Sequence, residues 1–138
     1  MKIGMIIGAV SLLFCACMKN DGSLIPDVYV NYQVPANDPS ISALNSPGGA
    51  VVVNGHGVAG LIIYNAAGKG LVAYDRCSSV NPEQKCAVNL DDPNLTATDP
   101  CSGGKFSMYD GAPVKAPAKR NLKQYTVVKT SLYLQVIN

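Results

Sequence analysis

After its N-terminal apolar run, the chain contains no stretch in which apolar residues recur with a sustained helical period. Prolines are scattered at intervals that would break long helices, because a proline removes a backbone hydrogen bond and clashes with the preceding turn. Short runs of β-branched and aromatic residues alternate with turn residues, a pattern typical of a small all-β domain. The predicted strands span residues 28–34, 50–53, 60–65, 71–75, 87–90, 95–98, 105–108, 123–129 and 132–137. Residues 35–49, rich in Pro, Asn, Asp and Ser, are predicted to form loop and turn.

The size and composition of the chain limit its architecture and its partners. Its 138 residues, 48% of them hydrophobic, suffice for one domain with a core but not for two ordinary domains. The net charge of +2 is too small for an electrostatic nucleic-acid binder, so no nucleic-acid partner is expected. The single histidine, His56, excludes any mechanism that needs two, and its place between two predicted strands indicates an exposed hairpin tip.

The N-terminal segment has the pattern of a signal peptide. Lys2 precedes an uncharged apolar run over residues 3–14, which is too short to cross a bilayer as a helix. The following Phe14-Cys15-Ala16-Cys17 resembles the lipobox of bacterial lipoproteins, and this resemblance implies cleavage before Cys17 and acylation of its thiol. An ordinary cleaved signal and a short anchor helix are the alternatives.

The lipobox resemblance also implies how the chain is organised. It divides the sequence into a signal peptide over residues 1–16, a lipidated tether over 17–26 and a β domain over 27–138. We therefore expect a lipoprotein anchored in a bacterial cell envelope, at the outer membrane, with the membrane as a partner through the N-terminal lipid.

The predicted β domain contains several short motifs whose order along the chain is characteristic. Cysteines occur in Ala73-Tyr-Asp-Arg-Cys77-Ser-Ser79, in Lys85-Cys86-Ala-Val88 and in Asp99-Pro-Cys101-Ser-Gly-Gly-Lys-Phe106. Leu44-Asn-Ser-Pro-Gly-Gly49 and Gly60-Leu-Ile-Ile-Tyr64 precede them, and Gly111 and Pro117-Ala-Lys-Arg-Asn-Leu122-Lys-Gln-Tyr125 follow them. This order resembles the Rieske iron–sulfur domain, in the form found in lipoproteins of Bacteroidetes-type bacteria. Over residues 28–137 the resemblance implies a stack of small antiparallel sheets.

The resemblance identifies four former cluster-ligand positions. A Rieske centre binds one iron through two Cys thiolates and the other through two His nitrogens. The corresponding residues here are Cys77, Ser79, Asp99 and Ser102, so only Cys77 keeps the ligand type. Because a hydroxyl does not replace an imidazole ligand, we predict that the domain carries no cluster and no other cofactor.

The resemblance also implies a disulfide. In Rieske domains of the quinol-oxidising type an extra Cys of each loop pairs with the other, and the matching residues are Cys86 and Cys101. The oxidising compartment of an exported protein permits that bond. Spacing alone leaves a Cys77–Cys101 bond open. Cys77 is otherwise a buried inert thiol, a reactive thiol or a partner for another chain, and the first is favoured.

Weaker patterns give further alternatives. The three downstream cysteines with Asp99 suit zinc chemically, but the chain lacks the Cys-x-x-Cys spacing of strong zinc motifs, so no metal site is predicted. Asp91 and Asp92, together with Asp99, are predicted to be solvated turn residues rather than a calcium or acid–base site. A positive stretch is predicted to be a solvated face, with anionic lipid or a glycan phosphate as the alternative ligand. It comprises Lys115, Lys119, Arg120, Lys123 and Lys129.

These patterns favour one function and leave one alternative. The favoured function is a lipid-anchored envelope protein, not expected to be an enzyme, whose cluster-less Rieske-like domain binds or assembles with a protein partner. The alternative is a Rieske-type electron-transfer protein with an unconventionally held cluster, or a thiol-redox protein that uses Cys77.

Overall fold

The structure is a computed structural model that describes residues 25–138. The predicted signal peptide and the lipidation site Cys17 lie outside these residues. Within the described part of the chain, no helix has the length and apolar character needed to cross a membrane.

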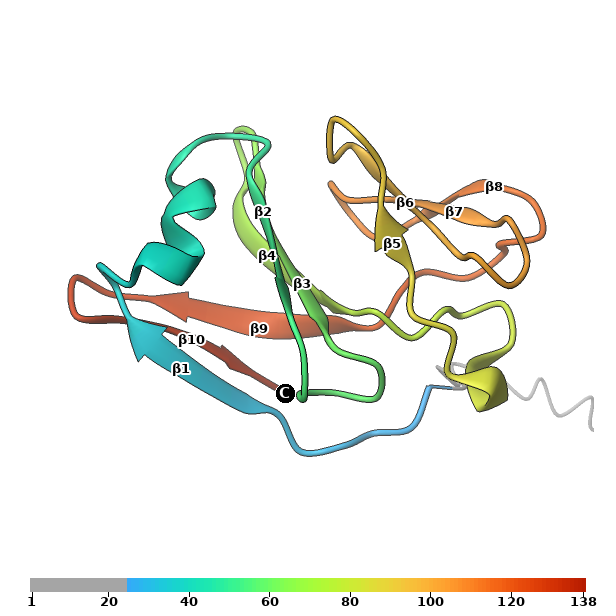
Figure 1. The fold of residues 1–138 in the computed structure, drawn as a ribbon, viewed down its shortest axis with the longest axis horizontal. Helices are drawn as coiled ribbons and strands as arrows, with labels where there is room; N and C mark the ends of the chain where they lie inside the picture. The colour runs from blue at the N-terminus through green and yellow to red at the C-terminus, as the bar shows by residue number, and fades with distance from the viewer. Residues whose placement is uncertain (1–24) are drawn as a thin grey trace, which may run out of the picture.

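Strands dominate the described chain, and all of their pairings are antiparallel (Figure 1). A six-stranded sheet has the order β1-β10-β9-β4-β3-β2, and a four-stranded sheet the order β5-β6-β7-β8. The larger sheet comprises β1 (Asn31–Pro35), β2 (Ala50–Val53), β3 (Leu61–Ala66), β4 (Gly70–Asp75), β9 (Gln124–Lys129) and β10 (Tyr133–Ile137). The smaller sheet comprises β5 (Asn89–Leu90), β6 (Thr96–Thr98), β7 (Lys105–Ser107) and β8 (Pro113–Lys115). Two short 3-10 helices are η1 (Pro39–Asn45) and η2 (Pro82–Gln84). The expected stack of small antiparallel sheets is confirmed.

Strand β3 explains how the layers are held together, because it is buried on both faces. Ile62 belongs to a core shared with Phe106 of the smaller sheet. Ile63 points the other way, into a core shared with Leu134 of β10. Ile62 therefore joins the larger sheet to the smaller one, whereas Ile63 packs β3 against another strand of its own sheet. Burial of each Ile side chain contributes about 1.5–3 kcal/mol.

The first strand is shorter than predicted. Pairing with β10 begins at Asn31 rather than at Val28. The ladder ends there because β10 ends at Ile137, and the side chain of Asn138 takes over its role. The Asn138 amide donates to the Val28 carbonyl at 2.7 Å, and its oxygen accepts from the Val30 amide at 3.2 Å.

The strand pattern missed three elements, namely both 3-10 helices and the strand β8. The predicted loop over residues 35–49 contains η1, whose Asp38 side chain caps it by accepting from the Ser40 amide at 2.8 Å. Ile41 and Leu44 bury one side of this helix. The short strand β8 lies at the edge of its sheet and leaves Val114 exposed, so it shows no apolar alternation.

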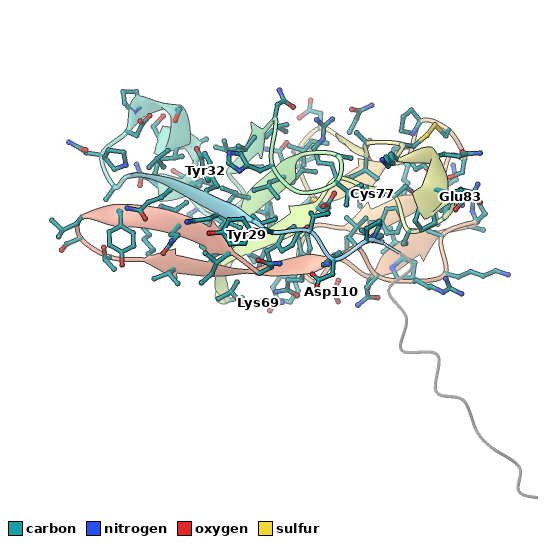
Figure 2. All side chains as sticks on the ribbon, turned by 90° about the horizontal axis from the view of Figure 1, so that it is seen from below. Tyr29, Tyr32, Lys69, Cys77, Glu83 and Asp110 are labelled. Carbon is teal, nitrogen blue, oxygen red and sulfur yellow. A yellow bond between two sulfur atoms is a disulfide. The ribbon has the colours of Figure 1, made fainter. Side chains whose placement is uncertain are left out.

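The described chain begins against the body of the domain, although the predicted tether extends to residue 26. Ile25 is buried. Lys123 Nζ donates to the Asp27 carboxylate at 2.8 Å and to the Pro26 carbonyl at 3.3 Å. Figures 1 and 2 place this first segment at the end of the long axis that carries η2.

Candidate functional site: the loop tip

Three loops meet at one end of the molecule, at the right of Figure 1. They are residues 76–88 between β4 and β5, residues 99–104 between β6 and β7, and residues 116–123 between β8 and β9. We call these three loops the tip. They carry the four ligand positions that the resemblance identified, together with Cys86 and Cys101.

A disulfide joins the first two loops of the tip. It links Cys86 to Cys101, the pairing that the resemblance implies, with a distance of 6.4 Å between the two Cα atoms. Below it, Cys77 and Ala87 form an isolated antiparallel bridge, and the Ser78 amide donates to the Cys86 carbonyl at 2.8 Å. The alternative Cys77–Cys101 bond is absent, and Cys77 is a free, buried thiol.

Asp99 is the centre of the second connection between these loops. Its carboxylate is only 1% exposed. It accepts hydrogen bonds from Ser102 Oγ at 2.6 Å, from Ser78 Oγ at 2.7 Å and from the Cys101 amide at 2.8 Å. Burial favours the neutral acid, but the hydrogen bonds from Ser102, Ser78 and Cys101 outweigh it and hold the pKa of Asp99 below its usual value.

The structure therefore brings only some of the predicted positions together. Asp99 and Ser102 are in direct contact, whereas Ser79 turns away and donates to the Arg120 carbonyl at 2.7 Å, which ties the first loop to the third. The residue that reaches Asp99 from the first loop is Ser78, which the motif comparison did not single out. The Ser-Ser pair after Cys77 offered two hydroxyls, and nothing in the spacing distinguished them.

Cys77 lies beneath these contacts and is completely buried. Figure 2 shows it inside the fold, with Glu83 of η2 further out toward the end of the molecule. Its sulfur is 3.6 Å from the Pro82 carbonyl oxygen. Burial and the nearby Asp75 carboxylate raise the pKa of the Cys77 thiol to about 11, so the neutral thiol dominates at physiological pH.

A second buried carboxylate, Asp75, holds the base of the tip and was not predicted from the sequence. It accepts from the amides of Val58, Ala59 and Cys77 at 2.6, 3.1 and 2.8 Å, and from the Tyr125 hydroxyl at 2.7 Å. A Cβ added at Gly57, where φ is +66°, would lie 2.5 Å from a carboxylate oxygen of Asp75, so this loop needs glycine. The only sequence signal was an aspartate that ends an apolar strand.

Several weaker predictions need correction. His56 is half-buried rather than exposed, because its ring packs edge-on against Tyr32 with centroids 5.2 Å apart. Asp99 is buried rather than solvated. Asp91 does begin a turn over residues 91–94, but its carboxylate is hydrogen-bonded: it accepts from the hydroxyls of Thr96 and Thr98 at 2.6 and 2.8 Å and pairs with Lys105 at 3.2 Å. Although burial raises the pKa of Asp91, these hydrogen bonds bring it below the usual value.

The basic stretch is not one solvated face. Lys123 is half-buried and pairs with Asp27, whereas Lys115, Lys119, Arg120 and Lys129 are exposed. Lys119 and Arg120 border a hollow of about 240 Å³ in the tip, whose other lining residues are Ser79, Val80 and Pro117. Among residues 25–138, neither of these two cations has an ion-pair partner.

The possible metal ligands in the described residues form a small group. Cys86, Asp99 and Cys101 offer ligand atoms that lie within 4.8 Å of one another. Cys77 is outside this group, so the zinc alternative that included it is not supported. The group contains no imidazole, and two of its sulfurs are bonded to each other, so these donors do not match a Rieske centre.

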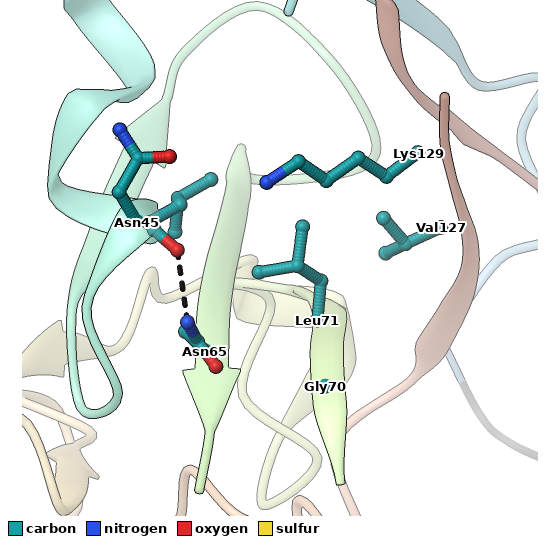
Figure 3. A pocket seen from close by; sticks show the side chains of 7 residues that line it. Asn45, Asn65, Gly70, Leu71, Val127 and Lys129 are labelled. Atoms are coloured by element: carbon teal, nitrogen blue, oxygen red, sulfur yellow. Dashed lines mark hydrogen bonds between the residues drawn. The ribbon is translucent and has the colours of Figure 1, made fainter. Parts of the chain in front are cut away.

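A larger hollow of about 400 Å³ lies away from the tip, between η1 and the strands β4 and β9 (Figure 3). Leu71 and Val127 provide apolar lining, and Lys129 extends across the opening. The Asn65 amide donates to the Leu44 carbonyl at 2.9 Å, which fixes η1 to β3 at the edge of this hollow. No motif in the sequence pointed to it.

Comparisons with known proteins identify the fold. No protein-family model and no curated protein matches the chain. Among solved structures, the plasma membrane Rieske protein PetC3 from the cyanobacterium Synechocystis PCC 6803 is 21% identical, with 75% of this chain and 97% of that chain covered and a TM-score of 0.54. A complex of oxygenase and ferredoxin in carbazole 1,9a-dioxygenase contains a chain that is 26% identical, with coverages of 78% and 93% and a TM-score of 0.48. The Sphingomonas yanoikuyae B1 ferredoxin is 21% identical, with coverages of 67% and 88% and a TM-score of 0.47. The similarity to PetC3 shows that the chain has a Rieske-like fold.

Proposed function

We propose that this protein is a lipid-anchored lipoprotein of a bacterial envelope whose Rieske-like domain holds no cluster and binds or assembles with another protein through the tip. The observation that carries the proposal is the state of Asp99. This residue stands where a Rieske domain has its second Cys ligand, and its carboxylate is buried and accepts three hydrogen bonds.

The hydrogen bonds of Asp99 give the tip a means of cohesion that needs no iron. Each is charge-assisted, and such bonds contribute about 1.5–3 kcal/mol when the acceptor is ionised. Ser78 and Ser102 belong to the two loops that a cluster would join, so the carboxylate links the same loops. The disulfide adds a covalent link between them.

A preformed tip is suited to binding because little ordering is required when a partner docks. The hollow of about 240 Å³ beside Lys119 and Arg120 gives it shape, and the two unpaired cations give it positive charge. Charge complementarity therefore favours a partner that presents acidic side chains. A crosslinking experiment tests this role.

In the native envelope, a photo-crosslinking residue in place of Lys119 should yield a discrete adduct with one protein. The matched control carries the same residue in place of Leu132, which is 77% exposed at the β9–β10 turn, at the other end of the molecule. Adducts of equal yield from both positions, or none from position 119, would contradict a tip-directed partner.

The anchoring part of the proposal rests on the N-terminal sequence. Lipid on Cys17 would leave residues 18–24 between the membrane and buried Ile25, a span of about 25 Å at full extension. The variant Cys17→Ala should lose metabolically incorporated fatty acid and move from the detergent phase to the aqueous phase. Retention of both properties would contradict acylation at Cys17.

The alternative redox functions have less support. The Rieske-like fold alone favours electron transfer, but the tip lacks the imidazole ligands of a Rieske centre. A thiol-redox role needs an accessible thiolate, whereas Cys77 is buried and its pKa is raised to about 11. Rapid alkylation of Cys77 in the native protein at neutral pH would favour this alternative.

A further inference from the structure

The disulfide and Asp99 link the same two loops, and their side chains also form one compact group of possible metal ligands. The carboxylate of Asp99 and the sulfurs of Cys86 and Cys101 lie within 4.8 Å of one another. They come from two loops, and their exposure increases from buried Asp99 through half-buried Cys86 to exposed Cys101. Two thiolates and a carboxylate are a ligand set that Zn²⁺ accepts.

We propose that reduction of the Cys86–Cys101 disulfide converts this group into a binding site for Zn²⁺ or another thiophilic divalent cation. A dithiol supplies the two electrons and two protons: its sulfurs become a cyclic disulfide, and Cys86 and Cys101 become thiols. Each thiol then loses a proton as its sulfur binds the metal. The metal ligands are the two thiolates, one oxygen of Asp99 and a water molecule.

The positions of the two cysteines suit this coordination. Their Cα atoms are 6.4 Å apart. Zn–S bonds of about 2.3 Å in a tetrahedral site place two sulfurs roughly 3.8 Å apart. Rotation of the two side chains provides this separation once the sulfur–sulfur bond is broken, because Cys101 is exposed and has room to turn.

The carboxylate of Asp99 is held in a fixed position near the two sulfurs. An ionised carboxylate has about four lone-pair positions, and Asp99 uses three of them to accept from Ser78, Ser102 and Cys101. The backbone amide of Ser102 also faces this carboxylate, so a metal would take the place of that contact. Hydrogen bonds from neighbouring groups that fix a ligand in this way are a general feature of metal sites.

The proposed site links the same two loops as the disulfide does. Oxidised chains would have a covalent clamp at the tip, and reduced chains a metal clamp. Cys77 takes no part, because its sulfur lies against the Pro82 carbonyl in the interior. The proposed metal site requires no protein partner, so its test can fail while the proposed function holds, and the reverse.

Cobalt binding to the full chain tests the site, with Cys15 and Cys17 replaced by Ser in every sample. After reduction with a phosphine, Co²⁺ titration should give thiolate-to-cobalt absorption bands and a stoichiometry of about one per chain. Zn²⁺ should displace the Co²⁺, and oxidised chains should bind neither ion. Asp99→Asn should weaken Co²⁺ binding by at least about tenfold. The matched control Asp91→Asn changes another hydrogen-bonded carboxylate, which follows β5 of the smaller sheet, and should leave affinity unchanged.

Four results would overturn the proposal. They are the absence of thiolate bands in reduced chains, equal binding to oxidised chains, affinity that does not change in Asp99→Asn, and loss of binding in Cys77→Ser. Far-ultraviolet circular dichroism of every sample monitors folding. If reduction unfolds the chain, Zn²⁺ must restore the β-sheet spectrum, and Zn²⁺ that fails to restore it contradicts the site as well.

Discussion

The six-stranded sheet and the tip are stabilised in different ways. Strands of the larger sheet have four to six residues, and β3 and β4 bury side chains in the two apolar cores. The smaller sheet, to which all three tip loops connect, has strands of only two or three residues. Its loops are fastened by one disulfide and by the hydrogen bonds of Asp99.

This difference explains how the strands of the fold can stay in place when the residues of the tip loops change. Stability of the larger sheet is distributed over many apolar contacts, to which the tip loops contribute only Val80, Val88, Ala118 and Leu122. Cohesion of the tip depends on a few specific contacts, so one set of loop contacts can replace another while the strands stay in place. The comparison predicts that substitutions in the larger sheet act globally and those in the tip locally.

The largest effect is expected from Ile63→Ala in β3. Removing a fully buried side chain from the core should lower the free energy of unfolding by about 2–5 kcal/mol. Chemical denaturation followed by circular dichroism measures this change. Val52→Ala on β2, where the side chain is 41% exposed, is the matched control and should cost less than about 1 kcal/mol. Equal losses in the two variants would contradict the distributed core.

Removal of the disulfide should have a smaller effect confined to the tip. Cys86 and Cys101 are separated by 15 positions, and closing a loop of about this length stabilises by roughly 3 kcal/mol on the chain-entropy model. In Cys86→Ala/Cys101→Ala, hydrogen exchange should accelerate over residues 76–88 and 99–104. Amides of β3 and β4 should keep their protection, and equal acceleration there would mean that the two regions unfold as one.

Asp99→Asn should destabilise the tip by about 1–3 kcal/mol. The amide loses the charge that strengthens the hydrogen bonds from Ser78 and Ser102. A double-mutant cycle with Ser102→Ala measures this coupling by chemical denaturation. The two substitutions should be less than additive, because each removes part of the same network. Strict additivity would show that the hydroxyl and the carboxylate act independently.

The smallest predicted effect concerns Cys77 and alkaline pH. An unperturbed cysteine thiol has a pKa of 9.0, and the pKa of Cys77 in the folded protein is about 11. Folding therefore favours the neutral thiol. The resulting stability is fully present below pH 9 and is lost as the pH rises toward 11. Between pH 7 and pH 10, the free energy of unfolding of Cys77→Ala should therefore fall by about 1.4 kcal/mol less than that of the parent chain. Identical pH profiles would contradict a raised Cys77 pKa.

Much of the larger sheet could be predicted from its residues. The β-branched runs predict β2 with its exact bounds, and β3 and β4 to within one residue, since burial on one or both faces selects such residues. The helix η1 was missed because Pro39 and the polar residues around it suggest a loop. Its signals were the Asp38 cap and the buried pair Ile41 and Leu44.

The tip was less predictable because its contacts join residues that are far apart in the sequence. The motif placed Asp99 and Ser102 at ligand positions, but the donor that reaches Asp99 from 21 positions away is Ser78 and not Ser79. Asp75 binds the Tyr125 hydroxyl across 50 positions. A local pattern gives no information about which hydroxyl turns inward, since this is decided by the path of the loop.

We propose that the tip holds together without an iron–sulfur cluster. The most direct test is to express the full chain in iron-replete cells, purify it without oxygen, and measure iron, acid-labile sulfide and the electron paramagnetic resonance spectrum after reduction. We expect a colourless protein with no stoichiometric iron or sulfide and no cluster signal. About two irons and two sulfides per chain, with a two-iron cluster signal that Cys77→Ser abolishes, would contradict it.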